Sequence, residues 1–383
     1  MLERYNLKMP KEVYSGTNAL EKLTDLLEGK KKVVIFTDNG ILKSGLLELP
    51  LKYIDEAKVS YDIIDDLKVE PSCDEVQEVV GRFKNLEADL LIAIGGGSVM
   101  DTAKLASVLM NDEYTVRDLI ADPSKAKKTI KTLMIPTTAG TGSEATPNSI
   151  VLVPEKELKV GIVSDEMIAD YVILDAEMIR KLPKKIAAAT GVDALSHAIE
   201  CYTSNKANPF SDMFALQALE LIMNNIEEAC NNPDAMDAKN AMLIGSFFAG
   251  VAITTSGTTA VHALSYPLGG KYHVPHGVSN AIMLLPVLRF NEPLCKHHFA
   301  KAHDRIWNSG DSLSVEEKSV KLLERISEIL VNVEIPTNLK EYHVPEEDLD
   351  ILVESGMDVK RLLVNNIREL TREDARKLYL EVL

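Results

Sequence analysis

The sequence has 383 residues, of which 46% are hydrophobic, and its formal net charge at pH 7 is −16. This length and apolar content are enough for two domains with buried cores. The acidic balance, without a basic stripe or tail, argues against binding to nucleic acids or to an anionic membrane. The four cysteines form no CxxC pair, the N-terminus lacks the apolar core of a signal peptide, and no stretch approaches a membrane span. We therefore expect a soluble, cytoplasmic protein.

Short apolar runs alternate with helical patterns in the first half of the chain. The runs that predict β-strands begin near residues 32, 59, 90, 131 and 171. The segment 73–88 between two of them carries its apolar residues at helical spacing. This alternation predicts a parallel sheet with covering helices. The segment 149–164 has two β-like runs around charged residues and predicts a hairpin.

The pattern changes near Leu182, where the proline of "KLPKK" interrupts it. Beyond this point helical patterns follow one another with little strand between them, over 184–204, 211–230, 238–253 and 314–330. We therefore predict two domains, an α/β domain of residues 1–181 and an all-helical domain of residues 182–383.

A glycine-rich turn follows the strand-like run in "LLIAIGGGSVMDTAK". The three glycines Gly95, Gly96 and Gly97 permit unusual backbone angles and close approach of a ligand. The helix that begins here would offer unpaired N–H groups to a phosphate, and we expect Ser98 to cap it together with Asp101. The spacing is neither GxGxxG nor a P-loop, so a tight corner without a ligand is the alternative.

A second loop, "PTTAGTGSEAT", follows the run "KTLMI" and gathers hydroxyl groups and glycines. Such a loop can hydrogen-bond ribose and phosphate oxygens without adding charge, although an ordinary surface loop has the same composition. We expect the two loops to meet at the carboxyl ends of neighbouring strands, where open α/β sheets bind ligands.

These two segments resemble the signature segments of the iron-containing alcohol dehydrogenase family, the metal-dependent group III dehydrogenases. The segments "GVDALSHAIECYTS", "HALSYPLGGKYHVPHGVSNAIMLLP" and "NNIRELTREDARKLY" also fall where the family has matching segments, so the resemblance covers nearly the whole chain. It implies a dehydroquinate synthase-like architecture: an α/β N-terminal dinucleotide-binding domain, an all-α C-terminal metal-binding and catalytic domain, and an active site in the cleft between them.

The resemblance implies a metal site formed by Asp193, His197, His262 and His276. Asp193 and His197 are four residues apart on a predicted helix and share one face. Without the resemblance, such a pair would be interpreted as a solvated ion pair. One carboxylate and three imidazoles suit Fe²⁺ or Zn²⁺, and spacing does not choose between them; the family favours Fe²⁺.

The resemblance also implies which residues contact the nicotinamide cofactor. Gly96, Gly97 and Ser98 resemble the pyrophosphate contacts, and Lys159 resembles a lysine that reaches the cofactor's ribose. Asp38, at the end of the first clear strand, can bind an adenosine ribose hydroxyl and repel a 2′-phosphate, so we expect NAD rather than NADP. A turn aspartate is the alternative. Four residues of the second loop and one of the first helix complete this set: Thr137, Thr138, Thr141, Ser143 and Asp101.

Tyr266 is a departure from the family, in which many members have a histidine four residues after the position of His262. The histidine is often assigned to proton relay or substrate contact. A tyrosine, with an unperturbed pKa near 10, is a poorer relay at neutral pH. We expect Tyr266 to line the substrate side of the metal site, one helical turn from His262. His273 is a second candidate catalytic residue; His273 and Cys201 can equally be a satisfied histidine and a core thiol.

The resemblance implies an oxidoreductase that transfers hydride between a nicotinamide cofactor and a small alcohol or aldehyde. We expect a homodimer or higher homo-oligomer. A metal- and NAD-dependent lyase or cyclase of the dehydroquinate synthase-like type is the first alternative, and a non-catalytic scaffold is the second. The "PTTAGTGSE" and "GVDALSHAIE" segments favour the dehydrogenase, and intact candidate ligands at all four metal positions argue against the scaffold.

Overall fold

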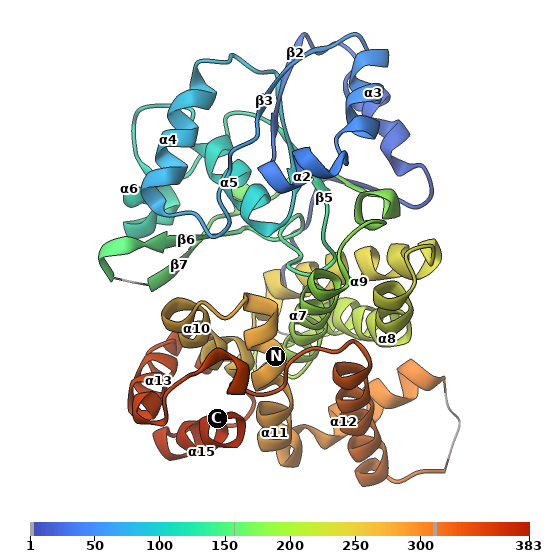
Figure 1. Cartoon of the computed structure of the whole chain (residues 1–383), viewed down its shortest axis with the longest axis vertical. Helices are drawn as coiled ribbons and strands as arrows, with labels where there is room; N and C mark the ends of the chain where they lie inside the picture. The colour runs from blue at the N-terminus through green and yellow to red at the C-terminus, as the bar shows by residue number, and fades with distance from the viewer. Residues whose placement is uncertain (1–3, 157, 309–311) are drawn as a thin grey trace. The chain divides into compact units, whose positions relative to one another are not determined.

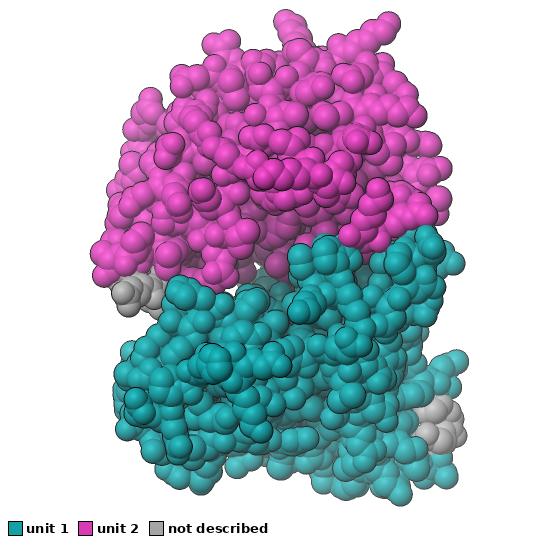
Figure 2. Space-filling view, viewed as in Figure 1, with its two compact units in different colours: residues 1–7, 182–383 teal, residues 8–181 magenta. Residues whose placement is uncertain are grey.

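The computed structural model describes residues 4–156, 158–308 and 312–383. The chain divides into two compact units, coloured separately in Figure 2. The α/β unit comprises residues 8–181, and the helical unit comprises residues 182–383 together with the described residues before Lys8. Those first residues group with the helical unit, whereas the sequence pattern assigns them to the α/β domain.

The α/β unit contains a six-stranded sheet in which every pair of neighbouring strands is parallel. The five predicted strands form. A sixth, at the sheet edge, was missed because its four residues are only partly buried and make no long apolar run. In sheet order the strands are β1 (Glu12–Ser15), β8 (Tyr171–Leu174), β5 (Thr132–Pro136), β4 (Leu90–Gly95), β2 (Lys32–Phe36) and β3 (Ser60–Ile64).

α-Helices lie in the connections between the strands from β1 to β5 along the chain, whereas the connection from β5 to β8 contains a β-hairpin and short 3-10 turns instead (Figure 1). The predicted helix over 73–88 forms as α4 and ends at Lys84. The predicted hairpin also forms, from β6 (Asn148–Val153) and β7 (Leu158–Val163). The α-helices of this unit are α1 (Lys22–Leu26), α2 (Asn39–Ser44), α3 (Glu48–Glu56), α4 (Cys73–Lys84), α5 (Gly97–Val108) and α6 (Val116–Ala121).

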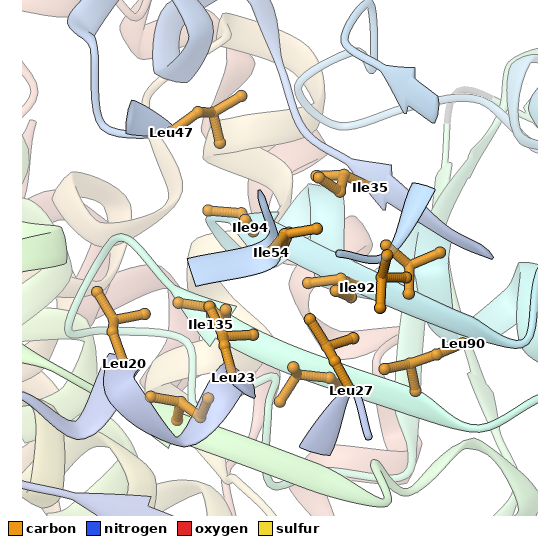
Figure 3. Close-up of a cluster of buried hydrophobic side chains, with 14 of the residues drawn as sticks. Leu20, Leu23, Leu27, Ile35, Leu47, Ile54, Leu90, Ile92, Ile94 and Ile135 are labelled. Carbon is orange, nitrogen blue, oxygen red and sulfur yellow. The ribbon is translucent and has the colours of Figure 1, made fainter. Parts of the chain in front are cut away.

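One face of the sheet forms an apolar core with the helices that cover it. Leucines from the first helical segment point at isoleucines and leucines of the central strands, as Figure 3 shows. These side chains are almost completely buried: Leu20, Leu23, Leu27, Ile35, Leu90, Ile92, Ile94 and Ile135. This burial holds β4 and β5 in a fixed register, with Gly95 opposite Pro136. The carboxyl ends of the two strands, and the loops that follow them, therefore lie side by side.

The helical unit confirms the helices predicted in the second half of the chain. Helices α7, α8 and α9 pack against one another, and α11 packs against α7, α10 and α12. The helices are α7 (Lys184–Tyr202), α8 (Pro209–Asn231), α9 (Met236–Ser256), α10 (Ala260–Tyr272), α11 (His276–Trp307), α12 (Val315–Asn332), α13 (Leu349–Met357), α14 (Lys360–Leu363) and α15 (Arg372–Val382).

Within the described residues, no single helix has both the length and the apolar character that crossing a membrane would require. Helices α9 and α10, bent by 106° relative to each other, meet that criterion only as a pair and only by length and composition.

Candidate functional site

Three helices of the helical unit bring the predicted metal ligands together. Asp193 and His197 lie one turn apart on α7, His262 lies in the first turn of α10, and His276 is the first residue of α11. Gly277 allows α11 to begin against α7, because a Cβ atom there would lie 2.1 Å from the carbonyl oxygen of Ala189. This close approach places His276 beside the face of α7 that carries the other ligands.

The four predicted ligand side chains lie close together around Asp193 Oδ1. Asp193 Oδ1 lies 3.6 Å from Nε2 of His262, 3.6 Å from Nε2 of His276 and 3.8 Å from Nε2 of His197. The Nε2 atoms of His197 and His262 are 2.9 Å apart, and their rings are stacked. Two imidazole lone pairs at this separation repel each other unless a proton or a cation lies between them.

The charges of the cluster favour a cation at this point. Burial alone would raise the pKa of the Asp193 carboxyl, but the neighbouring imidazoles hold it well below its usual range. Burial alone would lower the pKa of His262, but Glu200 and Asp193 together raise it to about 10. Both shifts reflect the same attraction, between buried carboxylates and positive charge on the imidazole side.

Glu200 was not among the predicted site residues, although it lies three residues after His197 on the same face of α7. Its carboxylate is buried, and Oε2 is in close contact with Nδ1 of His262. Its other oxygen accepts hydrogen bonds from the start of α10. The spacing D-x-x-x-H-x-x-E was the available signal, because it places all three side chains on one helix face.

Asn280, also not predicted, points its amide at the same centre. Nδ2 donates to Asp193 Oδ1 over 2.7 Å and lies 3.1 Å from His262 Nε2 and 3.3 Å from His276 Nε2. The amide oxygen Oδ1 is buried without a hydrogen-bond partner among the described residues. The NH₂ group of Asn280 thus lies among three acceptor atoms, while its oxygen has no donor within the described chain.

These observations fit a divalent ion. Donor atoms of Asp193, His262 and His276 lie within 4.8 Å of one another, and His197 is in contact with His262. Asp193 and Glu200 carry two negative charges that one divalent cation with neutral imidazoles would balance. One carboxylate and three imidazole nitrogens are ligands that both Fe²⁺ and Zn²⁺ accept.

The glycine turn of the α/β unit opens the N-terminus of α5. The expected cap by Ser98 and Asp101 is wrong: the N-cap is Gly96, and no side chain caps the helix within the described chain. Ser98 Oγ instead accepts a hydrogen bond from the backbone N–H of Glu70. The first N–H groups of α5 are thus not covered by a capping side chain, as a pyrophosphate site requires.

Two of the glycines are needed for close packing. A Cβ atom on Gly95 would lie 2.6 Å from the side chain of Val99, and one on Gly97 would lie 2.8 Å from that of Thr141. A Cβ atom on Gly96 would only touch Thr138, at 3.7 Å. The expected meeting of the two loops is therefore confirmed, since the glycine turn packs directly on two threonines of the second loop.

Asp101 and Lys104 on α5 hold the second loop in place. Asp101 Oδ1 accepts from Ser143 Oγ (2.5 Å) and pairs with Lys104 Nζ (2.9 Å), while Oδ2 accepts from the N–H of Ile150. Lys104, fully buried, also donates to the carbonyl oxygen of Ser143 (2.9 Å) and contacts Thr146. Both oxygens of Asp101 are thus engaged within the unit, and its observed role is to shape the loop.

The remaining loop residues surround the turn. Thr137 is buried, and its hydroxyl has no hydrogen-bond partner among the described residues. Thr138 and Thr141 are partly exposed beside the glycines. Lys159 on β7 pairs with Glu70 at 2.5 Å, and Glu70 is the residue that contacts Ser98. Hydroxyl and ammonium groups thus gather around the start of α5, a donor set that fits the phosphates and ribose of a dinucleotide.

Asp38 follows β2 and is the N-cap of α2. Its Oδ1 accepts from the N–H groups of Gly40 (2.7 Å) and Ile41 (3.0 Å). No described residue bonds to Oδ2. Asp38 is thus a capping aspartate whose second oxygen can accept a ribose hydroxyl.

Tyr266 lies next to the metal cluster, with its ring centre 6.5 Å from that of His262 and 6.0 Å from that of His276. His273 is exposed and ends α10 in a left-handed conformation, outside the cluster's hydrogen bonds. Cys201 is fully buried, its thiol contacts the carbonyl oxygen of Gly257, and burial raises its pKa to about 12. Cys201 is therefore a core thiol.

Comparison with known proteins agrees with this arrangement. Residues 10–176 match the family model for iron-containing alcohol dehydrogenases, and residues 187–383 match the model for the C-terminal part of the same family. The chain is 33% identical over 369 residues to long-chain-alcohol dehydrogenase 1 of Geobacillus thermodenitrificans, covering 95% of this chain and 93% of that one.

Solved structures show the same fold over the full length. The crystal structure of a 1,3-propanediol oxidoreductase superposes with a TM-score of 0.92 at 28% identity and covers 100% of both chains. Sulfoacetaldehyde reductase from Bifidobacterium kashiwanohense, in complex with NAD⁺, superposes with a TM-score of 0.88 at 26% identity, covering 100% of this chain and 99% of that one. The chain belongs to the iron-containing alcohol dehydrogenase family.

Proposed function

We propose that this protein is an NAD-dependent, iron-containing dehydrogenase of small primary alcohols and their aldehydes. Its metal ligands are Asp193, His197, His262 and His276. The observation that carries the proposal is the gathering of three imidazole nitrogens within 3.8 Å of one oxygen of the buried Asp193 carboxylate, where the surrounding charges favour a cation. Family membership supplies the general activity: the chain is a metal-dependent oxidoreductase that uses a nicotinamide cofactor.

The ion, when bound, supplies a Lewis acid for the substrate oxygen, and the nicotinamide supplies or accepts the hydride. The protein's part is to position these groups and exclude water. Asp193 and the imidazoles would hold the ion from three helices, and the packing of α7, α10 and α11 positions these side chains. Tyr266, beside His262 and His276, presents a hydroxyl group and a ring edge at the border of the cluster.

The names of the relatives support the substrate class but not a single substrate. They are named for a long-chain alcohol, a propanediol and sulfoacetaldehyde, so the names share an alcohol or aldehyde group and differ in chain length. We therefore propose a terminal alcohol or aldehyde group as the common element. The test is a panel of alcohols with NAD and NADP, and of aldehydes with the reduced cofactors, after reconstitution with Fe²⁺ and in parallel with Zn²⁺. Formation or consumption of reduced nicotinamide is measured. If none of the alcohols or aldehydes in the panel is converted, the proposal is rejected.

Net redox change also separates this function from a lyase or cyclase. Such an enzyme would return its cofactor to the starting state in each turnover, so reduced nicotinamide would not accumulate. Both matched family models describe alcohol dehydrogenases, which favours the redox reaction.

The preference for NAD rests on Asp38. Its carboxylate would bind the adenosine ribose through Oδ2 and repel a 2′-phosphate. We expect Asp38→Gly to use NADP better than the parent. Asp38→Asn is the matched variant, because its side-chain oxygen keeps the cap of α2 while the charge is removed. A parent enzyme that already prefers NADP would contradict this assignment.

We propose a homodimer or larger homo-oligomer, to be measured by light scattering of the purified protein. We also propose a cytoplasmic location, because four cysteines are unpaired, as in a reducing compartment. Because three of the four cysteines are buried, the second point is tested by labelling the thiols after the cells are quenched in acid and the protein is unfolded.

A further inference from the structure

We propose that Glu200 is a positioning residue of the metal centre, which fixes His262 in the tautomer that presents Nε2 to the ion. The inference rests on the proposed metal site and adds a residue that is not itself a ligand. It begins from the buried contact between the carboxylate of Glu200 and Nδ1 of His262.

The hydrogen bonds of Glu200 determine which atom carries the hydrogen between Oε2 of Glu200 and Nδ1 of His262. Oε1 accepts from three backbone N–H groups, of Thr259 (3.0 Å), Val261 (2.8 Å) and His262 (3.3 Å), and from the hydroxyl of Thr259 (2.7 Å). This oxygen is fully used, so Oε2 faces the imidazole. An ionised carboxylate can only accept, and Nδ1 of His262 must therefore carry the hydrogen.

A hydrogen on Nδ1 leaves the lone pair of the neutral imidazole on Nε2. That atom faces Asp193 Oδ1 at 3.6 Å and His197 Nε2 at 2.9 Å. The ligand atom thus points to the centre of the cluster because the opposite nitrogen is held by a carboxylate. Such pairs also make the metal-binding nitrogen more basic, and losing them typically weakens metal affinity 10- to 100-fold.

Glu200 also links two ligand-bearing helices. Glu200 lies on α7, with Asp193 and His197. Its Oε1 accepts hydrogen bonds from the N–H groups of Val261 and His262 in the first turn of α10. A negative charge at a helix N-terminus is stabilised by the helix dipole. One carboxylate therefore fixes both the start of α10 and the orientation of the ring that α10 carries.

Glu200→Gln tests the tautomer without removing the cap. The three backbone N–H groups require an acceptor, so the amide oxygen takes the place of Oε1 and the NH₂ group turns to Nδ1 of His262. An NH₂ group donates, so Nδ1 becomes the acceptor and the hydrogen moves to Nε2. His262 can then bind the ion through Nε2 only if this hydrogen moves back to Nδ1, which breaks the new hydrogen bond and weakens binding.

We expect the Glu200→Gln variant to bind Co²⁺ 10- to 100-fold more weakly than the parent, in competition with a chelator of known affinity, and to show an altered visible spectrum of the bound ion. Thr259→Val is the matched control. It removes one hydrogen bond to the same oxygen but leaves the carboxylate, so its Co²⁺ affinity should stay within about threefold of the parent. In a His262→Ala background, Glu200→Gln should have no further effect on affinity.

The outcomes separate this inference from the proposed function. A parent protein without a Co²⁺ or Zn²⁺ site would overturn both. A parent that binds Co²⁺ tightly, with a Glu200→Gln variant of equal affinity and spectrum, would overturn the role of Glu200 alone. If the variant does not fold, nitrogen NMR of the Zn²⁺-loaded parent decides the point. A hydrogen on Nδ1 of His262 supports the assignment, and zinc bound through Nδ1 overturns it.

Discussion

The two units each contain a buried polar cluster built on a helix, and the two clusters differ in how their charges are balanced. The cluster of the α/β unit consists of Asp101, Lys104, Ser143, Thr146 and the N–H of Ile150. The cluster of the helical unit, here called the metal cluster, consists of Asp193, His197, Glu200, His262, His276 and Asn280.

The first cluster contains its own cation. Lys104 is fully buried and pairs with Asp101 at 2.9 Å. The negative charge of Asp101 is therefore balanced by a side chain of the protein itself. In the metal cluster the ion-pair partners of Asp193 and Glu200 are imidazoles, and the amide oxygen of Asn280 has no described partner. The difference indicates which cluster is structural and which needs an external ion. A buried charge costs several kcal/mol unless it is paired, and only the first cluster pairs its charges with a permanent cation.

The largest expected effect comes from removing a proposed metal ligand. His262→Ala and His276→Ala should lower metal content and activity together, because each removes one donor from the ion. We expect an activity loss of at least about 10³-fold, since the Lewis acid contributes several kcal/mol to the transition state. Metal analysis of the purified variants and their turnover rates provide the measurement.

His297→Ala is the control, because His297 is exposed on the same helix as His276. It should keep both metal and activity. Full metal occupancy in both ligand variants would contradict the assignment and remove the distinction between the two clusters.

The second-largest expected effect comes from removing the buried cation of the α/β unit's cluster. Lys104→Met should lower the free energy of unfolding by about 3–5 kcal/mol, because Asp101 is left as a buried, unpaired charge. Metal content should not change. Urea unfolding and metal analysis on the same sample check both parts. A variant with parental stability that has lost its metal would show that this cluster is not the structural one.

How well the sequence predicted these clusters depends on how local each signal is. The strands and long helices were predicted because their apolar periodicity lies within a few residues. The cap by Ser98 was wrong, because Ser98 bonds to Glu70, which is distant in the sequence. No local pattern contains that contact.

The metal ligands came from the resemblance, and their convergence needs three helices that the sequence does not place in space. Glu200 was missed for a different reason. Its spacing from Asp193 and His197 was visible, but its partner His262 lies 62 residues away. Asp101 was expected at the cofactor, whereas its two oxygens bond to Ser143, Lys104 and Ile150. In both cases one partner is distant in the sequence, His262 for Glu200 and Ser143 for Asp101, and no local pattern contains it.

Glu144 is a second buried carboxyl group of the α/β unit and lies in the same loop as Ser143. Burial raises its pKa to about 7 from the ordinary 4.5, although Lys104 opposes the shift. The folded state therefore keeps a proton that the unfolded chain releases, and stability is lost as pH rises from about 4.5 to 7. The loss is on the order of 3 kcal/mol, from about 1.4 kcal/mol for each pH unit.

Glu144→Gln should abolish this part of the pH dependence and be more stable than the parent at pH 8. Urea unfolding at pH 5 and pH 8 measures it. Glu78→Gln, at an exposed position of α4, should leave the pH dependence as in the parent. An identical pH profile in Glu144→Gln and the parent would show that the cluster of the α/β unit accommodates this charge.

The smallest expected effect concerns Tyr266, at the border of the metal cluster. Its ring lies 6.5 Å from that of His262 and 6.0 Å from that of His276, measured between ring centres. The phenol therefore stands where a substrate on the ion would be contacted, but it is not a ligand. Tyr266→Phe keeps the ring and removes the hydroxyl, and it should lower activity by roughly tenfold, or about 1.4 kcal/mol, with metal content unchanged. Tyr266→His adds a group that titrates near neutral pH and should change the pH–rate profile between about pH 6 and 8. Rates, substrate ranking and pH profiles of both variants are compared with the parent at full metal occupancy. If neither the rates, the substrate ranking nor the pH profile changes, Tyr266 is a packing residue. The functional residues of this site are then only the six of the metal cluster, which are the four proposed ligands, Glu200 and Asn280.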